Sequence, residues 1–138
     1  NGKKMLGKKV SQIDTKGIYS ETFNIVTTID YLESNEKVAE KFLKALIKSE
    51  KWIKANRNKA ITLIAKTVGM DRDALAPIFD DYVYEVVLDQ KTLDILNAHA
   101  AWRLESGNHP DGVTSVPNFE KVIFSEPLSK VAPNRVKL

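Results

Sequence analysis

The stretch that decides the fold runs from Phe23 to Asn56 and reads FNIVTTIDYLESNEKVAEKFLKALIKSEKWIKAN. Its opening residues are apolar and β-branched, and with the residues just before them they predict a strand over 19–29. After Ser34, which can act as an N-cap, apolar residues recur every three or four positions through Trp52, and lysines occupy the opposite face. The stretch therefore predicts a strand that leads directly into a long amphipathic helix.

Turn and capping residues divide the rest of the chain. Gly69 and Gly107 are expected to end helices, because glycine readily adopts the left-handed conformation found at helix C-termini. Asp71 and Asp89 can cap helix N-termini, and Pro77 shortens or bends the helix that follows Asp71. The expected helices span about 58–68, 71–79 and 89–107, and the expected strands span 8–13 and 82–88. Together these elements predict a mainly helical α+β domain.

The overall composition describes an ordinary globular protein with a single domain. The chain has 138 residues, of which 43% are hydrophobic and 28% charged, and its net charge of +3 is too small to indicate a nucleic-acid partner. The absence of cysteine excludes disulfides, thiol catalysis and thiolate metal sites. No apolar run approaches the roughly 20 residues that span a bilayer. Because the chain starts at Asn1 and shows no apolar signal segment, we expect it to be part of a longer protein.

Side chains that carry chemistry are sparse. His99 lacks a second metal ligand four residues on, because Arg103 stands there, and His109 has only Asp111 as a neighbouring ligand. The adjacent carboxylates at 80–81 would point to different faces of a helix, so they would not share a proton. No phosphate-binding glycine loop and no nucleophile elbow is present. The sequence therefore predicts no metal site, no cofactor and no enzymatic activity.

Residues 60–75 have the pattern of a helix-turn-helix, with a glycine in the turn and apolar residues in register. The second helix of this pattern carries several aspartates around the single Arg72, and Pro77 interrupts it. Carboxylates repel phosphates, and phosphate contacts supply most of the affinity for DNA. A DNA-binding module is therefore an alternative with the charge pattern against it.

Residues 19–138 resemble the C-terminal part of the ABC-transporter substrate-binding proteins of the nitrate/sulfonate/taurine type (NMT1/THI5-like). Four stretches in a fixed order carry the resemblance. They are IVTTIDYLESN at 25–35, the helix 38–56 with its ending KWIKANR, the helix 96–107 with its Ala-Trp pair, and EPLSKVAPNRV at 126–136. One departure is Arg57, which stands where the family commonly has proline.

The resemblance implies a periplasmic-binding-protein type II fold, in which two α/β lobes are joined by crossing strands. Residues 1–18 would be the end of the second lobe and a lead-in. Residues 19–138 would form the hinge return strand and the C-terminal part of the first lobe. The chain would then be a mainly helical α+β fragment of a larger two-lobed fold.

The hinge crossing supplies the candidate site, because hinge strands border the ligand in such a fold. The candidate ligand-binding residues are Tyr19, Ser20, Glu21 and Thr22. Their hydroxyl groups suit a small anionic or zwitterionic ligand. The same residues are equally compatible with a strand and turn that bind nothing.

The function that the resemblance implies is solute capture, as part of the substrate-binding subunit of an ABC importer for a small anionic or heterocyclic compound. The implied partners are that small-molecule ligand and the permease subunits, with no nucleic acid and with membrane contact only through the permease. The parent protein would be periplasmic or extracellular and membrane-associated. A homodimer is one way for the isolated chain to cover apolar surface. The alternatives are a helix-turn-helix DNA-binding module and a ligand-sensing domain of a signalling receptor.

Overall fold

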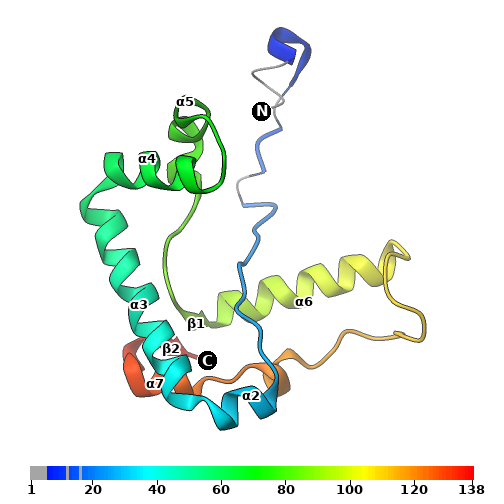
Figure 1. The fold of residues 1–138 in the computed structure, drawn as a ribbon. Helices are drawn as coiled ribbons and strands as arrows, with labels where there is room; N and C mark the ends of the chain where they lie inside the picture. Colours follow the sequence, from blue (N-terminus) through cyan, green and yellow to red (C-terminus); the bar gives the residue numbers. More distant parts are fainter. Residues whose placement is uncertain (1–5, 12, 16) are drawn as a thin grey trace. The chain divides into compact units, whose positions relative to one another are not determined.

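A computed structural model describes residues 6–11, 13–15 and 17–138 (Figure 1). The described chain is mainly helical, and its strand pairing is limited to a two-stranded parallel sheet. With η marking 3₁₀ helices, the elements are η1 (Gly7–Lys9), α2 (Ile29–Ser34), α3 (Glu36–Ala55), α4 (Arg57–Thr67), α5 (Arg72–Leu75), η2 (Ala76–Asp81), β1 (Leu88–Asp89), α6 (Gln90–Glu105), η3 (Phe119–Val122), α7 (Glu126–Val131), η4 (Pro133–Arg135) and β2 (Val136–Lys137). This content agrees with the expectation of a mainly helical α+β chain.

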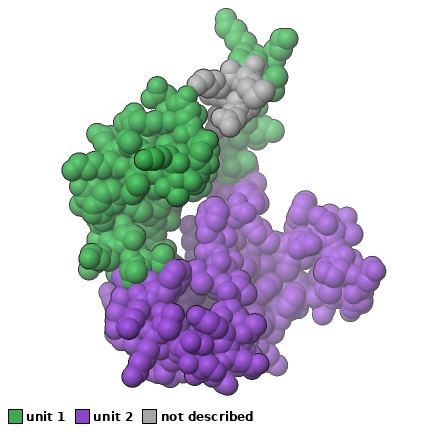
Figure 2. All heavy atoms as spheres, viewed as in Figure 1, with its two compact units in different colours: residues 1–15, 45–86 green, residues 16–44, 87–138 purple. Residues whose placement is uncertain are grey.

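The chain divides into two compact units, which are green and purple in Figure 2. The first unit contains residues 1–15 and 45–86, and the second contains residues 16–44 and 87–138. The boundary falls inside α3, so the first part of this helix belongs to the second unit and its last part to the first. The division expected between residues 18 and 19 refers to the lobes of a larger fold, and it stays a prediction.

In the first unit, α4 and α5 form a helical hairpin around Gly69. This glycine has a φ of +65°, a left-handed conformation that costs a residue with a Cβ about 1–2 kcal/mol. The chain turns here, and the amide of Met70 donates to the carbonyl of Ala65 at 2.9 Å. Asp71 then caps α5, because its Oδ1 accepts a hydrogen bond from the amide of Asp73 at 2.8 Å. The predicted end of the first helix and the predicted cap of the next are both confirmed.

The core of the first unit lies among α4, α5 and η2. Its buried apolar residues are Ala60, Ile61, Ala65, Leu75 and Phe79, and the partly buried residues packed against them are Ile53, Ile64, Met70, Ala76 and Tyr84. Ile61 is completely buried, and full burial of an isoleucine contributes about 1.5–3 kcal/mol of stability. The aromatic rings of Phe79 and Tyr84 lie 5.0 Å apart in a tilted arrangement. This small core fixes which face of α4 points inward.

In the first unit, a buried carboxylate joins α3 to the segment that follows η2. Glu50 is only 6% exposed. Its Oε1 accepts from the ammonium of Lys54 at 2.8 Å, and its Oε2 accepts from the amide of Val86 at 3.2 Å. Both carboxylate oxygens thus have donors, as a buried charge requires.

In the second unit, β1 and β2 pair in parallel, with Leu88 opposite Val136 and Asp89 opposite Lys137. Asp89 also caps α6, because its Oδ1 accepts from the amide of Thr92 at 3.0 Å. The helix ends before Gly107, which has a φ of +70°. The predicted cap and the predicted terminating glycine of this helix are both confirmed.

The second unit has few fully buried apolar side chains, among them Leu93 of α6 and Leu128 of α7. Lys130 of α7 forms ion pairs with Glu126 on the same helix, at 2.9 Å, and with Glu36 at the start of α3. These hydrogen bonds raise the pKa of Lys130 above its ordinary range. The ion pair with Glu36 therefore links elements that are far apart in the sequence.

The strand predicted over 19–29 is wrong. Residues 18–28 form no ladder with any described residue, and Ile29 already begins α2. Strand propensity reports how well side chains fit a sheet surface, and it has no effect where no neighbouring strand is present. The apolar side chains of this segment are consequently exposed, with Val26 at 84% and Ile25 at 61%.

Two other predicted strands and one cap are also corrected. Of the strand expected at 82–88, only Leu88 pairs, together with the residue after it. The part of 8–13 that is described begins in η1, and residue 12 lies outside the described residues. Ser34 is the last residue of α2 and not an N-cap, because a short helix forms before α3 and is capped by Thr28, whose Oγ1 accepts from the amide of Tyr31 at 3.2 Å.

Within the described part of the chain, no helix combines the length and the apolar character needed to cross a bilayer.

Candidate functional site

The four residues predicted to contact a ligand lie in the extended segment that precedes α2, in the second unit. Tyr19, Ser20 and Glu21 are exposed, and Thr22 is half-buried. The hydroxyl of Thr22 accepts a hydrogen bond from the side-chain amide of Asn24 at 3.1 Å. The three exposed side chains are therefore accessible from solvent.

Tyr19 has an aromatic neighbour that sequence reasoning missed. Its ring stacks on the imidazole of His99, with 5.3 Å between ring centroids and 14° between ring planes. His99 lies in the middle of α6 and is half-buried, whereas Tyr19 is 55% exposed. Eighty positions of sequence separate the two residues, and no spacing pattern connects them. In the sequence, the residues around His99 could be assessed only for metal binding. The stacking of His99 on Tyr19 is therefore seen only in the tertiary structure.

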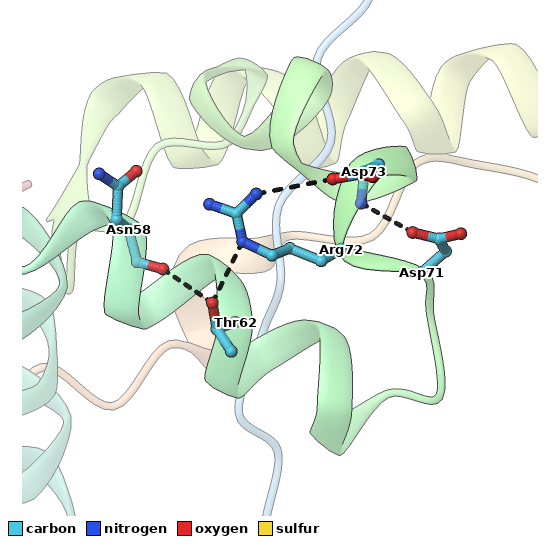
Figure 3. Close-up of polar contacts among 5 residues, drawn as sticks. All are labelled: Asn58, Thr62, Asp71, Arg72 and Asp73. Carbon is cyan, nitrogen blue, oxygen red and sulfur yellow. Dashed lines mark hydrogen bonds and ion pairs between the residues drawn. The ribbon is translucent and has the colours of Figure 1, made fainter.

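A second feature is an open hollow on the surface of the first unit, with a volume of about 450 Å³. It is lined by α4 and by the first residue of α5, through the side chains of Asn58, Lys59, Thr62, Leu63, Lys66 and Arg72. Figure 3 shows how several of these residues and two neighbouring aspartates lie. No motif in the sequence singles out this group.

The hollow follows from the two-sided character of α4. Its lining residues are spaced three and four positions apart, so they share one face of the helix. Ala60, Ile61 and Ala65 occupy the opposite side and are buried in the core. Burial of the apolar stripe therefore turns the basic stripe of α4 outward.

Arg72 is held in place by a chain of hydrogen bonds (Figure 3). Its Nε donates to the hydroxyl of Thr62 at 3.2 Å, and that hydroxyl donates to the carbonyl of Asn58 at 3.1 Å. The Nη1 group of Arg72 lies 3.6 Å from a carboxylate oxygen of Asp73. The guanidinium is thus oriented against α4 although its side chain is 47% exposed.

The hollow is strongly positive for its size. Three of its lining residues are cationic, and none of the described residues that line it is acidic. No described carboxylate forms an ion pair with Lys59 or Lys66. Arg72 pairs with Asp73, whose side chain is 88% exposed. An exposed pair at this distance is weak, so most of the positive charge is uncompensated.

The carboxylates at 80–81 do not act together. Asp80 accepts two hydrogen bonds from the guanidinium of Arg57, at 3.0 and 2.6 Å. These hydrogen bonds lower the pKa of Asp80, and the nearby positive charge adds to the effect, whereas partial desolvation opposes it. Asp80 is therefore a structural ion-pair partner and not half of a proton-sharing pair.

Metal-ligating side chains do not gather anywhere in the part of the chain that the structure describes. His109, whose neighbour in the sequence is Asp111, has its Nδ1 3.1 Å from the carbonyl of Pro110. His99 lies against Tyr19 instead of another ligand.

The helix-turn-helix pattern forms as two helices around Gly69, but the second helix is only four residues long. A helix that reads the major groove must present several residues along its length to base edges. The basic side chains also lie mainly on α4, the first helix, and not on α5.

Comparison of the chain with protein-family models, with curated proteins and with solved structures found no match.

Proposed function

We propose that the chain is the C-terminal part of the substrate-binding subunit of an ABC importer, and that it takes part in capturing a small anionic or heterocyclic compound. The parent protein has the two-lobed periplasmic-binding-protein type II fold and works in the periplasm or outside the cell. It hands its ligand to permease subunits, reaches the membrane only through them and catalyses no reaction.

The observation that carries the proposal is the stack of Tyr19 on His99. It puts an aromatic pair beside the exposed side chains of Ser20 and Glu21. A planar heterocycle can stack on such a pair, and hydroxyl groups can orient polar substituents or an anionic group. These four residues combine the apolar face and the few polar groups that small-molecule sites use.

The exposed segment before α2 also supports the proposal. Ile18, Phe23 and Val26 are each about 80% exposed or more. A stable domain rarely leaves so many large apolar side chains in one short segment uncovered. A segment that crosses between two lobes of a larger fold would be covered by the strands and helices around it.

The DNA-binding alternative has weaker support, since α5 is short and begins among the carboxylates of Asp71 and Asp73. A ligand-sensing domain of a receptor would use the same capture chemistry, but it would pass a signal onward after binding instead of delivering the ligand to a permease.

The first test is the size of the native gene product in its own cells. The proposal predicts a mature protein much larger than 15.5 kDa, with a processed secretory start. A native product of this size that begins near Asn1 would contradict the proposal and would favour a self-contained interaction module.

The second test is ligand binding by the native product, screened by calorimetry with nitrate, sulfonates, pyrimidines and aromatic acids. For the ligand that binds, Tyr19→Ala and His99→Ala are expected to weaken affinity by roughly two- to tenfold, because an aromatic pair contributes about 0.5–1.5 kcal/mol. Tyr31→Ala is the matched control, since Tyr31 is also an exposed tyrosine but lies on α2. Equal effects of Tyr19→Ala and Tyr31→Ala would exclude the stack from the site.

A further inference from the structure

The basic face of α4 has a feature that solute capture at the segment 19–22 does not explain. Lys59, Lys66 and Arg72 converge on one open hollow of the first unit, whereas the predicted ligand residues lie in the second unit. The hollow is therefore a separate feature, and its function does not depend on the solute-binding proposal.

The arrangement in the hollow differs from the ion pairs found in other parts of the described chain, where Lys44 lies next to Glu40 and Lys130 lies next to Glu126. In the hollow, three cations share one face with no acidic lining residue. Like charges that lie close together repel and lower stability. A bound anion would remove that repulsion.

Arg72 supplies a preorganised donor. Because its Nε is already bonded to Thr62, the guanidinium has a fixed orientation, and no described acceptor is bonded to its Nη2. The N–H groups of Nη2 can donate a charge-assisted hydrogen bond to an oxygen of a tetrahedral oxyanion. Lysine ammonium groups add charge from flexible stems and can approach the same anion from other sides. Fixing one donor in advance lowers the entropy lost on binding.

We propose that the hollow formed by Lys59, Thr62, Lys66 and Arg72 is a binding site for a small tetrahedral oxyanion such as phosphate or sulfate. Arg72 makes the directional contacts, the two lysines neutralise the charge, and Thr62 orients Arg72. The anion can be free in solution or be a terminal group of a larger small molecule.

The size of the site favours a small oxyanion over a nucleic-acid backbone. A duplex needs a row of phosphate contacts along an extended surface. Here the hollow brings together three cations, and the carboxylates of Asp71 and Asp73 lie at the start of α5, beside Arg72 (Figure 3). These carboxylates limit how far a polyanion could extend past the site.

The experiment is a titration of the isotope-labelled chain with inorganic phosphate and with sulfate, followed by NMR of the backbone amides and of the Arg72 Nε–H group. Sodium chloride at the same ionic strength is the reference. The expected result is a saturable shift at Asn58, Thr62 and Arg72 with either oxyanion and no saturable shift with chloride.

Variants distinguish specific oxyanion binding in the hollow from non-specific attraction to the positive charge of the chain. Arg72→Gln and Lys66→Gln are each expected to weaken oxyanion binding about two- to fivefold, the range for exposed charge pairs. Thr62→Val should weaken it without changing charge, and Arg72→Lys should restore only part of the affinity. Lys51→Gln is the matched control, because it removes an equal charge from an exposed position of α3 in the same unit. Circular dichroism checks that each variant folds.

Three outcomes would overturn the inference. One is the absence of saturable shifts. Another is an equal loss in Lys51→Gln and Arg72→Gln, which would show only diffuse attraction. The third is steeply salt-dependent binding of duplex DNA that is lost in the same variants, which would identify a nucleic-acid contact instead.

Discussion

The guanidinium of Arg57 donates two hydrogen bonds to the carboxylate of Asp80, from Nε at 3.0 Å and from Nη2 at 2.6 Å. The same guanidinium lies 5.6 Å from the centroid of the Phe79 ring. This bidentate contact ties the first residue of α4 to η2 at the surface of the first unit. Two parallel hydrogen bonds restrict the geometry more than a single-point ion pair does. The contact therefore restricts the position of η2 relative to the start of α4.

Replacement of Asp80 by asparagine should change how stability depends on pH. Hydrogen bonds from Arg57 lower the pKa of Asp80 below its ordinary value of 3.8. The ionised form is thus favoured in the fold, and this stabilisation is present above pH 3.8 and is lost as the pH falls through the lowered pKa. We expect Asp80→Asn to be less stable than the native chain near neutral pH and the difference to shrink in acid. Urea unfolding at a series of pH values measures it.

The neighbouring carboxylate provides the control for this experiment. Asp81 is exposed, and Asp81→Asn makes the same chemical change one residue further on. The role assigned to the Arg57–Asp80 contact would be contradicted by one result. In that result, the difference in free energy of unfolding between Asp80→Asn and the native chain stays constant over the whole acid range.

Removal of the buried carboxylate of Glu50 should destabilise the chain. Glu50→Ala removes the carboxylate that accepts hydrogen bonds from the amide of Val86 and from the ammonium of Lys54. Hydrogen bonds to a charged group contribute about 1.5–3 kcal/mol, and Glu50→Gln should cost less because an amide oxygen still accepts. Glu40→Ala on the same helix is the control, since Glu40 is less buried, at 25% exposed, and its i,i+4 pair with the exposed Lys44 contributes at most a few tenths of a kcal/mol. Chemical denaturation would refute the assignment if Glu50→Ala and Glu40→Ala cost the same.

Substitution of Gly69 tests the turn that positions α5. No atom lies within 4 Å of the place where a Cβ would be, so the cost of Gly69→Ala is conformational and not a clash. With a φ of +65°, it should lose about 1 kcal/mol, and Gly69→Asn should lose less because asparagine tolerates the left-handed region. Thermal unfolding compares the two variants. An Ala variant as stable as the native chain would mean that the turn adopts another conformation.

The exposed segment before α2 should make the isolated chain self-associate. Val26 is 84% exposed, and the run from Phe23 to Ile29 contains no charged residue, so nothing in it repels a second copy. We expect light scattering to give a mass above the monomer value of 15.5 kDa that falls toward it in Val26→Lys. Val83→Lys is the control, because Val83 is 81% exposed in the other unit. A monomeric native chain at high concentration would contradict this prediction.

Local signals predicted the helices well. Gly69 and Gly107 end helices with positive φ, and Asp71 and Asp89 accept the capping hydrogen bonds expected of them. These features depend on residues within four positions of each other, so the sequence contains the whole physical cause. The prediction at Ser34 was wrong because Thr28 competes as a cap and starts an additional short helix.

Strands were predicted poorly because a strand is stable only when it forms hydrogen bonds with a neighbouring strand. The residues of 19–29 have strand composition but no neighbouring strand among the described residues, whereas Leu88 forms a ladder with Val136 from the end of the chain. A parallel pair needs a segment far away in the sequence, and no local pattern names that segment.

The candidate sites divide in the same way. The sequence by itself determined the helix ends at Gly69 and Gly107, the caps at Asp71 and Asp89 and the positions of hydroxyl-bearing residues at 19–22, because each follows from spacing and side-chain chemistry. Only the tertiary structure decided that Tyr19 stacks on His99 and that Thr62 orients Arg72 beside two lysines. Those relationships arise when burial of the core turns particular side chains toward each other. The free energy of that burial comes from contacts between distant segments, so no local segment contains it.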